Sequence, residues 1–361
     1  NKYSSFNSYK GLTYYENYKN IVAWMNGDAE LRPPVECNLD PYAECNLRCG
    51  FCITQRYLRD KREEVGEMRV LPEDYMIRLV DFLADWGVRG FCISGGGEPT
   101  LHDATPALLR HAVRKGMEAS LFTNAVKLSD EMIDAMMVCK WISLSVDAGD
   151  RETYKQVKGA DRFSQVVHNL ERLSAARNGT NVSLVFKLLI LPENADSIFK
   201  ACKLAKEVGL QAIHIRPADL ERLDITRASE STFDIPRVYE AFERCHELED
   251  DNFRVFTVTH KFDPEFRVKH DFEGCLATPL VLPIMTDGNA YLCVDHKMEA
   301  EYKLGSCYPD PLKTLDWWGS DKHRELIKSV NIERCSRCTW GQYNSQIENT
   351  VLKDSMSLSF P

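Results

Sequence analysis

Residues 88–123, VRGFCISGGGEPTLHDATPALLRHAVRKGMEASLFT, contain one full cycle of the pattern that sets the fold. An apolar stretch at Val88–Ser94 ends in glycines, and a helical pattern covers Ala104–Lys115. A second strand-like stretch follows at Glu118–Thr123. Strand and helix alternating at this spacing predict βα units, which place successive strands parallel in one sheet.

The same alternation extends in both directions along the chain. Strands are predicted at Glu36–Pro41, Val88–Ser94, Glu118–Thr123, Trp141–Asp147, Val182–Leu191 and Ala212–Pro217. Helices are predicted at Pro72–Trp86, Ala104–Lys115, Asp130–Cys139, Arg162–Arg177 and Ala195–Val208. About six βα units fit either a doubly wound sheet or a barrel, and periodicity alone does not decide between them. We prefer an α/β fold built as a partial (β/α)6 TIM-like barrel.

The two ends of the chain depart from this rhythm. The first 35 residues contain an aromatic-rich helical pattern, which we expect to pack outside the core. Beyond the last barrel strand we predict a connection at Ala218–Ile235, a helix at Pro236–Asp250 and a strand at Phe253–His260. Asp287–Gly288 lies between two apolar stretches and predicts a hairpin. The predicted divisions are 1–35 (helical extension), 36–220 (barrel), 221–271 (connection), 272–345 (small α+β domain) and 346–361 (tail).

Composition excludes several classes of protein. The 361 residues carry 45 Lys and Arg against 54 Asp and Glu, a net charge of −9, so neither nucleic acid nor an anionic membrane is an expected partner. The longest nearly apolar run is too short to span a bilayer, and no signal-peptide core is visible. Thirteen cysteines, an odd number, argue against a disulfide framework. We therefore predict a cytoplasmic protein whose reduced thiols are available to bind metal.

Three cysteines stand close together directly after the first predicted strand. The run from Cys45 through Cys49 to Cys52 has the spacing C-x3-C-x2-C. Three thiolates in one loop can hold three irons of a [4Fe–4S] cluster and leave the fourth iron open to a small molecule. A zinc site needs four ligands, commonly in paired C-x2-C units, and a catalytic thiol needs only one cysteine. The cluster is therefore the preferred interpretation.

A glycine-rich turn follows the second predicted strand. In Ser94-Gly95-Gly96-Gly97-Glu98-Pro99-Thr100, the glycines permit close backbone approach to a ligand. The carboxylate of Glu98 can accept hydrogen bonds from an ammonium group. The spacing is not that of a dinucleotide-binding turn. Taken alone, the segment also fits an ordinary tight βα turn.

The cysteine run, with the aromatic Phe51 before its third cysteine, resembles the cluster motif of radical S-adenosylmethionine (SAM) enzymes. That resemblance implies that SAM binds the open iron and is cleaved to a 5′-deoxyadenosyl radical, which abstracts hydrogen from a C–H bond. It also implies an external one-electron reductant of the flavodoxin or ferredoxin kind. The glycine-rich turn resembles the family's motif for the SAM amino group. By the same resemblance, the predicted SAM contacts are Phe51, Gly96, Gly97, Glu98, Pro99, Thr123, Asn124, Ser145, Asn194 and Arg216.

A second group of cysteines lies near the end of the chain. Cys275, Cys293 and the pair Cys335 and Cys338 fit a four-thiolate site for zinc or for a fully ligated cluster. The layout, with a hairpin between the first two and a helix before the pair, is similar to the Twitch domain, the short relative of the SPASM domain. The resemblance implies one auxiliary [4Fe–4S] cluster.

Two further residues are catalytic candidates. Arg216 ends the sixth predicted strand, where it can bind the SAM carboxylate, hold an anionic substrate or act beside a substrate hydroxyl. An ion pair at the rim of the barrel is the alternative. Cys307 has no place in either group of cysteines. It can be a spare ligand, a hydrogen-atom donor or a buried small hydrophobic residue.

Three reactions fit these features. The first is oxidation of an alcohol to a ketone on a small polar substrate such as a sugar or cyclitol, with the auxiliary cluster as electron acceptor. The second is epimerisation of a sugar, and the third is modification of a peptide by crosslinking, thioether formation or epimerisation. A scaffold that holds zinc or a cluster without turnover is the non-enzymatic alternative. Because only about 35 residues precede the barrel, too few for a separate peptide-binding domain, we favour the small polar substrate.

Overall fold

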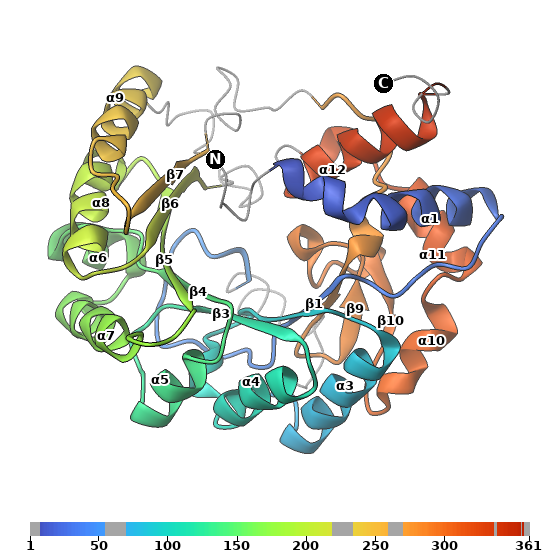
Figure 1. Ribbon diagram of the computed structural model, residues 1–361, viewed down its shortest axis with the longest axis horizontal. Helices are drawn as coiled ribbons and strands as arrows, with labels where there is room; N and C mark the ends of the chain where they lie inside the picture. The colour runs from blue at the N-terminus through green and yellow to red at the C-terminus, as the bar shows by residue number, and fades with distance from the viewer. Residues whose placement is uncertain are drawn as a thin grey trace.

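The computed structural model describes residues 8–54, 70–218, 234–258, 270–335, 338–354 and 356. Within these ranges one sheet contains ten strands in the order β10-β9-β8-β1-β2-β3-β4-β5-β6-β7. Helices cover the outer side of the sheet, which curves into an open arc (Figure 1). From β1 to β7 the spatial order follows the sequence order, without the reversal that marks a doubly wound sheet. The predicted partial barrel is therefore confirmed, and the sheet does not close.

The barrel strands lie where the sequence predicts them, with small differences at their ends. The parallel strands are β1 (Glu36–Leu39), β2 (Gly90–Ile93), β3 (Glu118–Thr123), β4 (Trp141–Ser145), β5 (Ser183–Ile190), β6 (Ala212–Pro217) and β7 (Arg254–Thr257). Both β3 and β6 have the predicted limits. The strand expected at Phe253–His260 corresponds to β7, and its last two predicted residues lie outside the described ranges.

The helices of the arc pack an apolar core against the outer face of the sheet. They are α3 (Glu73–Trp86), α4 (Thr105–Arg114), α5 (Asp130–Met136), α6 (Arg151–Lys158), α7 (Phe163–Ala176), α8 (Ile198–Glu207) and α9 (Ile235–His246). The sequence did not predict α6, a short and strongly polar helix. Its ends nevertheless carry the usual signals, since Asp150 caps the first turn and Gly159 adopts a left-handed conformation after the last. No helix in the described ranges is long and apolar enough to cross a membrane.

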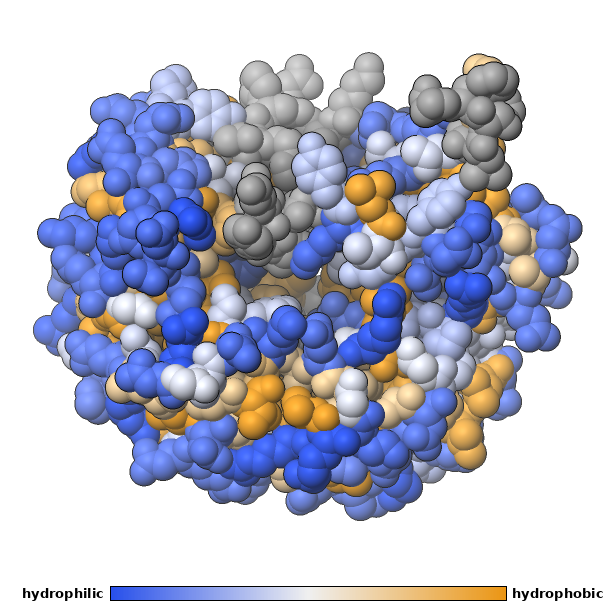
Figure 2. Space-filling view, viewed as in Figure 1, coloured by the Kyte–Doolittle hydropathy of each residue, from blue (hydrophilic) through white to orange (hydrophobic). Residues whose placement is uncertain are grey.

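The two faces of the sheet differ in chemistry. Along β5, Leu184, Phe186, Leu188 and Ile190 are fully buried in the apolar core, whereas the alternate residues are only half-buried. Lys187 is one of these alternate residues, and it pairs in register with Ser145 of β4 and His214 of β6. Residues paired in this way lie on the same face of a sheet. A row of polar side chains therefore lines the inner face of the arc, where a hollow opens near the centre of the molecule (Figure 2).

The C-terminal strands continue the barrel sheet. β8 (Val281–Ile284) pairs parallel with β1, and β9 (Asn289–Tyr291) returns antiparallel to β8 through Asp287–Gly288. β10 (Lys303–Ser306) completes this edge. The predicted hairpin is confirmed. The boundary that we predict at residue 272 thus falls between elements of one continuous sheet, and the division into domains stays a prediction.

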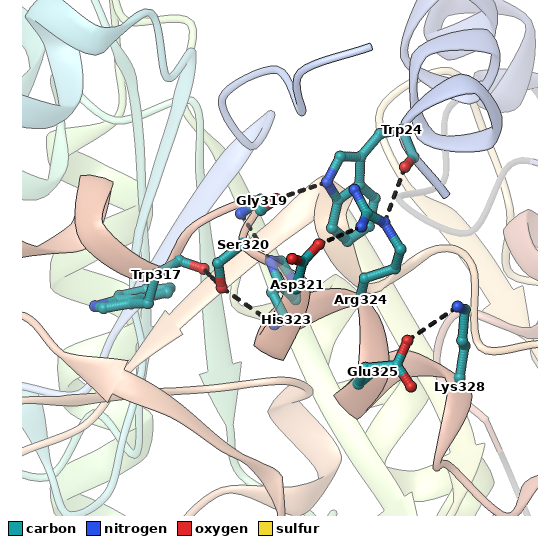
Figure 3. A network of polar contacts seen from close by, with 9 residues as sticks. All are labelled: Trp24, Trp317, Gly319, Ser320, Asp321, His323, Arg324, Glu325 and Lys328. Carbon is teal, nitrogen blue, oxygen red and sulfur yellow. Dashed lines mark hydrogen bonds and ion pairs between the residues drawn. The ribbon is translucent and has the colours of Figure 1, made fainter. Parts of the chain in front are cut away.

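The N-terminal helix α1 (Tyr15–Asn26) packs against the C-terminal region. The indole of Trp24, which is buried, donates to the carbonyl of Gly319 at 2.8 Å, and the Arg324 guanidinium donates to the carbonyl of Trp24 at 3.0 Å. The ring of His323 lies against Trp24 with centroids 5.1 Å apart (Figure 3). Arg324 and His323 belong to α11 (Asp321–Lys328), which occupies the predicted helix before the last cysteine pair. The expected N-terminal helix exists, and its apolar face is buried rather than peripheral.

Candidate functional site

The first cysteine group lies in a loop that packs directly on the glycine-rich turn. Cys45, Cys49 and Cys52 are half-buried, and burial raises the pKa of Cys45 to about 11. The backbone N–H of Glu98 donates to the carbonyl of Glu44 at 2.8 Å, which ties the turn to the residue before the first cysteine. The two motifs, separated in sequence by a helix, therefore form one surface at the carboxyl ends of β1 and β2. This is the edge at which parallel αβ barrels place their active sites.

Two glycines of the turn are required by close backbone contacts. A Cβ atom on Gly97 would lie 2.1 Å from the carbonyl oxygen of Glu44, and one on Gly95 would lie 2.2 Å from the carbonyl oxygen of Gly97. Gly96 differs, because its nearest neighbours would be the Asp40 and Thr54 side chains, 3.6 and 3.7 Å away. Gly96 is thus the member of the motif whose space remains accessible to a ligand.

The Glu98 carboxylate is buried and bound by the protein itself. It accepts hydrogen bonds from the Thr123 hydroxyl at 2.7 Å, from the Asn124 N–H at 2.8 Å, and from the hydroxyl and N–H of Thr100 at 2.8 and 3.1 Å. Burial raises the pKa of Glu98, and these hydrogen bonds oppose the rise. Pro99 begins the short helical turn that follows. Glu98 therefore fixes the turn to the end of β3, and its predicted contact with the SAM amino group stays a prediction.

Asn124 connects the end of β3 to the cysteine loop. Its amide nitrogen lies 2.8 Å from Oδ1 of Asn46 and 3.7 Å from Sγ of Cys45, and its amide oxygen accepts from the N–H of Val126. An N–H group aimed at sulfur favours the charged thiolate form that an iron–sulfur cluster requires. The donor set of this loop fits a cluster.

Ser145 on β4 and Arg216 on β6, which the sequence predicts as SAM contacts, face the inside of the arc. Ser145 pairs with Lys187, whose ammonium lies 2.8 Å from Nδ1 of His214 and 5.7 Å from the centre of the Phe122 ring. Arg216 follows two residues after His214 on the same face of β6. Three basic side chains thus gather on the inner face. Sequence reasoning missed Lys187, because it is embedded in an otherwise apolar strand.

Asn194 occupies a different environment. It is fully buried, and its amide donates to the carbonyls of Asp147 and Leu189 at 2.8 and 2.9 Å while its oxygen accepts from the N–H of Leu191. The amide is therefore occupied in holding the loops after β4 and β5 together. The predicted contact of Asn194 with adenosine stays a prediction.

A buried ion pair, which the sequence did not reveal, joins the C-terminal region to the barrel edge. The Lys297 ammonium lies 3.0 Å from both carboxylate oxygens of Asp40 and 3.0 Å from Oδ1 of Asn38. The hydroxyl of Ser94 donates to Asp40 at 2.5 Å, and the Asp40 side chain is fully buried. Asp40 and Ser94 follow β1 and β2 directly. The strand-end positions are the signal by which Asp40 and Ser94 could have been found.

The second cysteine group meets around one cavity. Cys275, Cys293, Cys335 and Cys338 line it together with His296 and Trp340, among others. Three nitrogens approach the sulfurs: the Asp295 N–H lies 3.4 Å from Cys293, the Asn344 amide 3.6 Å from Cys338 and Nε2 of His296 3.6 Å from Cys335. Burial and the neighbouring thiols raise the pKa of Cys275. The fold therefore brings together the four cysteines that the sequence predicts as one site.

The kind of metal that this group would hold stays a prediction. A single zinc ion gathers four ligands around one point, whereas the thiolates of a four-iron cluster bind separate irons. Four thiols with nitrogens near three of them fit the predicted cluster.

Cys307 is part of the apolar core. It is fully buried, in the same core cluster as Cys37 of β1 and Tyr75 of α3. Its backbone N–H donates to the carbonyl of Gly288 beside the hairpin turn. This environment is that of a packed core residue. The hydrogen-atom donation considered for Cys307 stays a prediction.

Part of the barrel matches a known family. Residues 39–205 match the model of the radical SAM superfamily. Among curated proteins, the GTP 3′,8-cyclase of Chlorobaculum tepidum is 34% identical over 183 residues, which are 48% of this chain and 52% of that protein. The S-adenosylmethionine-dependent nucleotide dehydratase of Lacinutrix mariniflava is 25% identical over 203 residues, or 54% of this chain and 42% of that protein. The chain thus spans about half the length of these two relatives.

Solved structures share the fold over a longer stretch. SuiB of Streptococcus suis, bound to its precursor peptide SuiA, superimposes with a TM-score of 0.63 and 18% identity over 92% of this chain and 74% of SuiB. Native anSMEcpe with bound AdoMet gives a TM-score of 0.60 and 19% identity over 86% of this chain and 89% of that protein. At these identities the likeness concerns the fold alone.

Proposed function

We propose that the protein is an oxidoreductase of the radical SAM kind, whose family model residues 39–205 match, and that it converts an alcohol of a small polar substrate, such as a sugar or cyclitol, into a ketone. Cys45, Cys49 and Cys52 hold a [4Fe–4S] cluster whose open iron binds SAM. When reduced by an external flavodoxin-like or ferredoxin-like protein, this cluster supplies the electron that splits SAM into methionine and the radical that removes hydrogen from the substrate.

The second cysteine group is the observation that carries this proposal. Oxidation of an alcohol removes two electrons and two protons, and the radical takes one electron and one proton together as a hydrogen atom. The second electron needs an acceptor inside the protein. The four cysteines around the C-terminal cavity, with nitrogen donors beside three sulfurs, supply a site for an auxiliary [4Fe–4S] cluster in that role.

The remaining steps belong to side chains on the inner face of the arc. Ser145 and Arg216 stand where hydroxyl groups of a polar substrate can be bound, and the same face contains Lys187. The carboxylate of Asp40, held by Lys297 beside the Gly96 turn, is the acceptor for the hydroxyl proton. A general base must come within hydrogen-bond reach of the proton that it removes, and Asp40 lies beside the turn where Gly96 leaves space for a ligand.

A second candidate is a substrate with an anionic group, such as a nucleotide. Lys187, His214 and Arg216 place basic side chains on two neighbouring strands of the inner face. Such a cluster suits a phosphate or carboxylate. Two of the relatives are named for reactions of nucleotides.

The test compares the reconstituted wild-type protein with the Cys335→Ala/Cys338→Ala variant under strictly anaerobic conditions. Each is incubated with SAM, dithionite and a panel of sugars, aminocyclitols and GTP, and 5′-deoxyadenosine and products are measured by mass spectrometry. We expect the wild type to convert one panel member to a product two mass units lighter. The variant should still form 5′-deoxyadenosine but no ketone. A product of unchanged mass would instead identify an epimerase, and turnover of GTP alone would favour the nucleotide candidate.

A further inference from the structure

The carboxyl end of α6 packs beneath the first cysteine group. The backbone N–H of Arg48, one residue before Cys49, donates to the carbonyl of Lys158 at 3.2 Å. Gly159 follows in a left-handed conformation, and a Cβ atom there would lie 2.7 Å from the carbonyl oxygen of Arg48. The last residue of α6 is thus fixed against the middle of the cysteine loop by two close backbone contacts.

The side chain of Lys158 is buried at this contact. It is 2% exposed, it forms an ion pair with Asp147, and its ammonium lies 5.5 Å from the centre of the Phe51 ring. Asp147 is itself anchored, because its other carboxylate oxygen accepts from the N–H of Leu189 at 2.7 Å. Both charges therefore have defined positions within the protein.

The lysine charge lies next to the cysteine loop. The ammonium faces the ring of Phe51, which immediately precedes Cys52, and the Lys158 carbonyl is bound by Arg48, which immediately precedes Cys49. Burial lowers the pKa of Lys158, but the ion pair with Asp147 and the other neighbours more than compensate, so the lysine stays charged.

Packing alone does not account for such a pair. Burying an ammonium and a carboxylate costs several kcal/mol of desolvation for each ion, and apolar residues of similar size commonly replace buried ion pairs with little loss of stability. An iron–sulfur cluster bound by thiolates is anionic, and its reduction potential depends on nearby charge, hydrogen bonds to sulfur and solvent exposure. A fixed positive charge favours the more negative, reduced state.

We propose that Lys158 is an electrostatic positioning residue that raises the reduction potential of the cluster held by Cys45, Cys49 and Cys52, and that Asp147 limits this effect. The proposal rests on the proposed function, since it presupposes a cluster in the cysteine loop. In the step concerned, the cluster gains one electron from a one-electron reductant, and no bond to the lysine forms or breaks.

The experiment measures the cluster potential directly, without turnover. All variants are made in a Cys335→Ser/Cys338→Ser background, so that only the first cluster is titrated. Potentials are determined by anaerobic redox titration followed by electron paramagnetic resonance, in the absence of SAM. The variants are Lys158→Met, Lys158→Arg, Asp147→Asn and the double variant Lys158→Met/Asp147→Asn. Lys140→Met is the matched control, because Lys140 is exposed and pairs with Glu118 at the opposite end of β4.

We expect Lys158→Met to shift the potential to more negative values and Asp147→Asn to shift it to more positive values. Lys158→Arg and Lys140→Met should stay close to the background protein. Lys158→Met can fail to fold because Asp147 is left unpaired. In that case the double variant Lys158→Met/Asp147→Asn tests the proposal, and its potential should be more negative than that of Asp147→Asn.

Two outcomes overturn the proposal while leaving the proposed function intact. The first is that Lys158→Met leaves the potential of the background protein unchanged, and that the double variant keeps the potential of Asp147→Asn, with about four irons retained per chain. The second is an unchanged potential with a weakened affinity for SAM, which would assign Lys158 to binding the cofactor. If the background protein holds no cluster at all, the proposed function itself fails.

Discussion

The first cysteine group takes its three thiols from residues 45–52, whereas the second takes its four from separate segments between residues 275 and 338. The first is half-buried, and the side-chain amide of Asn124 and the backbone N–H of Leu47 both lie near Sγ of Cys45. In the second, Cys275 and Cys335 are buried and nitrogens lie near three sulfurs. Hydrogen bonds and burial are among the features that set cluster potentials. The first group is thus the more exposed of the two, and the second is the more enclosed.

The largest effect should come from removing either group of cysteines. We expect Cys45→Ala/Cys49→Ala/Cys52→Ala to abolish formation of 5′-deoxyadenosine from SAM, because no cluster remains to supply the electron. Iron should fall from about eight to about four per chain, as expected for two four-iron clusters. Replacing Cys335 and Cys338 should remove a similar amount of iron and leave SAM cleavage in place. Iron analysis and chromatography of the nucleoside check both results. Loss of SAM cleavage in both variants would mean that the two groups do not act separately.

The next largest effect should come from substituting glycines of the turn that packs on the first cysteine group. Gly97→Ala places a Cβ atom 2.1 Å from a backbone oxygen of Glu44, so we expect a loss of about 1–3 kcal/mol in unfolding free energy. Because Glu44 precedes Cys45, the cluster loop should shift and iron retention should fall. Gly96→Ala, with its nearest contact at 3.6 Å, is the matched control and should change stability by about 0.5 kcal/mol or less. Urea unfolding and iron analysis test the pair. Equal effects from both substitutions would contradict this explanation.

The contrast between the two groups also explains what the sequence could predict. The three cysteines of the first group are close in the chain, so their spacing specifies the geometry of the loop. The barrel strands could be predicted because strand and helix patterns alternate strongly. The second group depends on β8 joining the sheet beside β1, a pairing between distant segments that periodicity does not specify. The sequence nevertheless groups the four cysteines that line one cavity in the structure, and their role as cluster ligands stays a prediction.

Two lysines that the sequence did not reveal also depend on contacts that no local sequence pattern specifies. Lys297 pairs with Asp40, 257 residues earlier in the chain, whereas Lys158 pairs with Asp147, 11 residues earlier and just after β4. Neither lysine belongs to a recognisable motif. Conversely, Asn194 follows a strand as a ligand-binding residue would, but its amide is occupied by neighbouring backbone groups. Strand-end positions therefore indicate where a site is. They do not tell a ligand contact from a structural hydrogen bond.

Lowering the pH should destabilise the C-terminal region around α11 before it affects the first cysteine loop. His323 packs between Trp24 and Trp318, and burial lowers its pKa to about 3 from an ordinary value of 6.5. Below pH 6.5 the unfolded chain binds a proton that the folded chain excludes, so stability falls as the pH drops from 6.5 towards 3. At pH 5 this histidine should cost about 2 kcal/mol relative to pH 7.5.

The measurement compares urea unfolding at pH 7.5 and pH 5, followed by tryptophan fluorescence. His323→Gln should reduce the difference between the two pH values, and His168→Gln, at an exposed position, should not. Because α11 leads into Cys335, the second group should also lose iron at a higher pH than the first. The same pH dependence in wild type and His323→Gln would show that other groups govern acid sensitivity.

The smallest effect we expect is a change in reduction potential on removing one nitrogen donor from each group. Asn344→Leu removes the amide 3.6 Å from Cys338, and Asn124→Leu removes the amide 3.7 Å from Cys45. Each should make its own cluster harder to reduce, since a lost hydrogen bond to sulfur destabilises the more negative state. The other cluster should keep its potential. Redox titration of both variants with full iron content tests this. A shift of both potentials together would indicate that the substitution disturbs the shared sheet rather than a single sulfur.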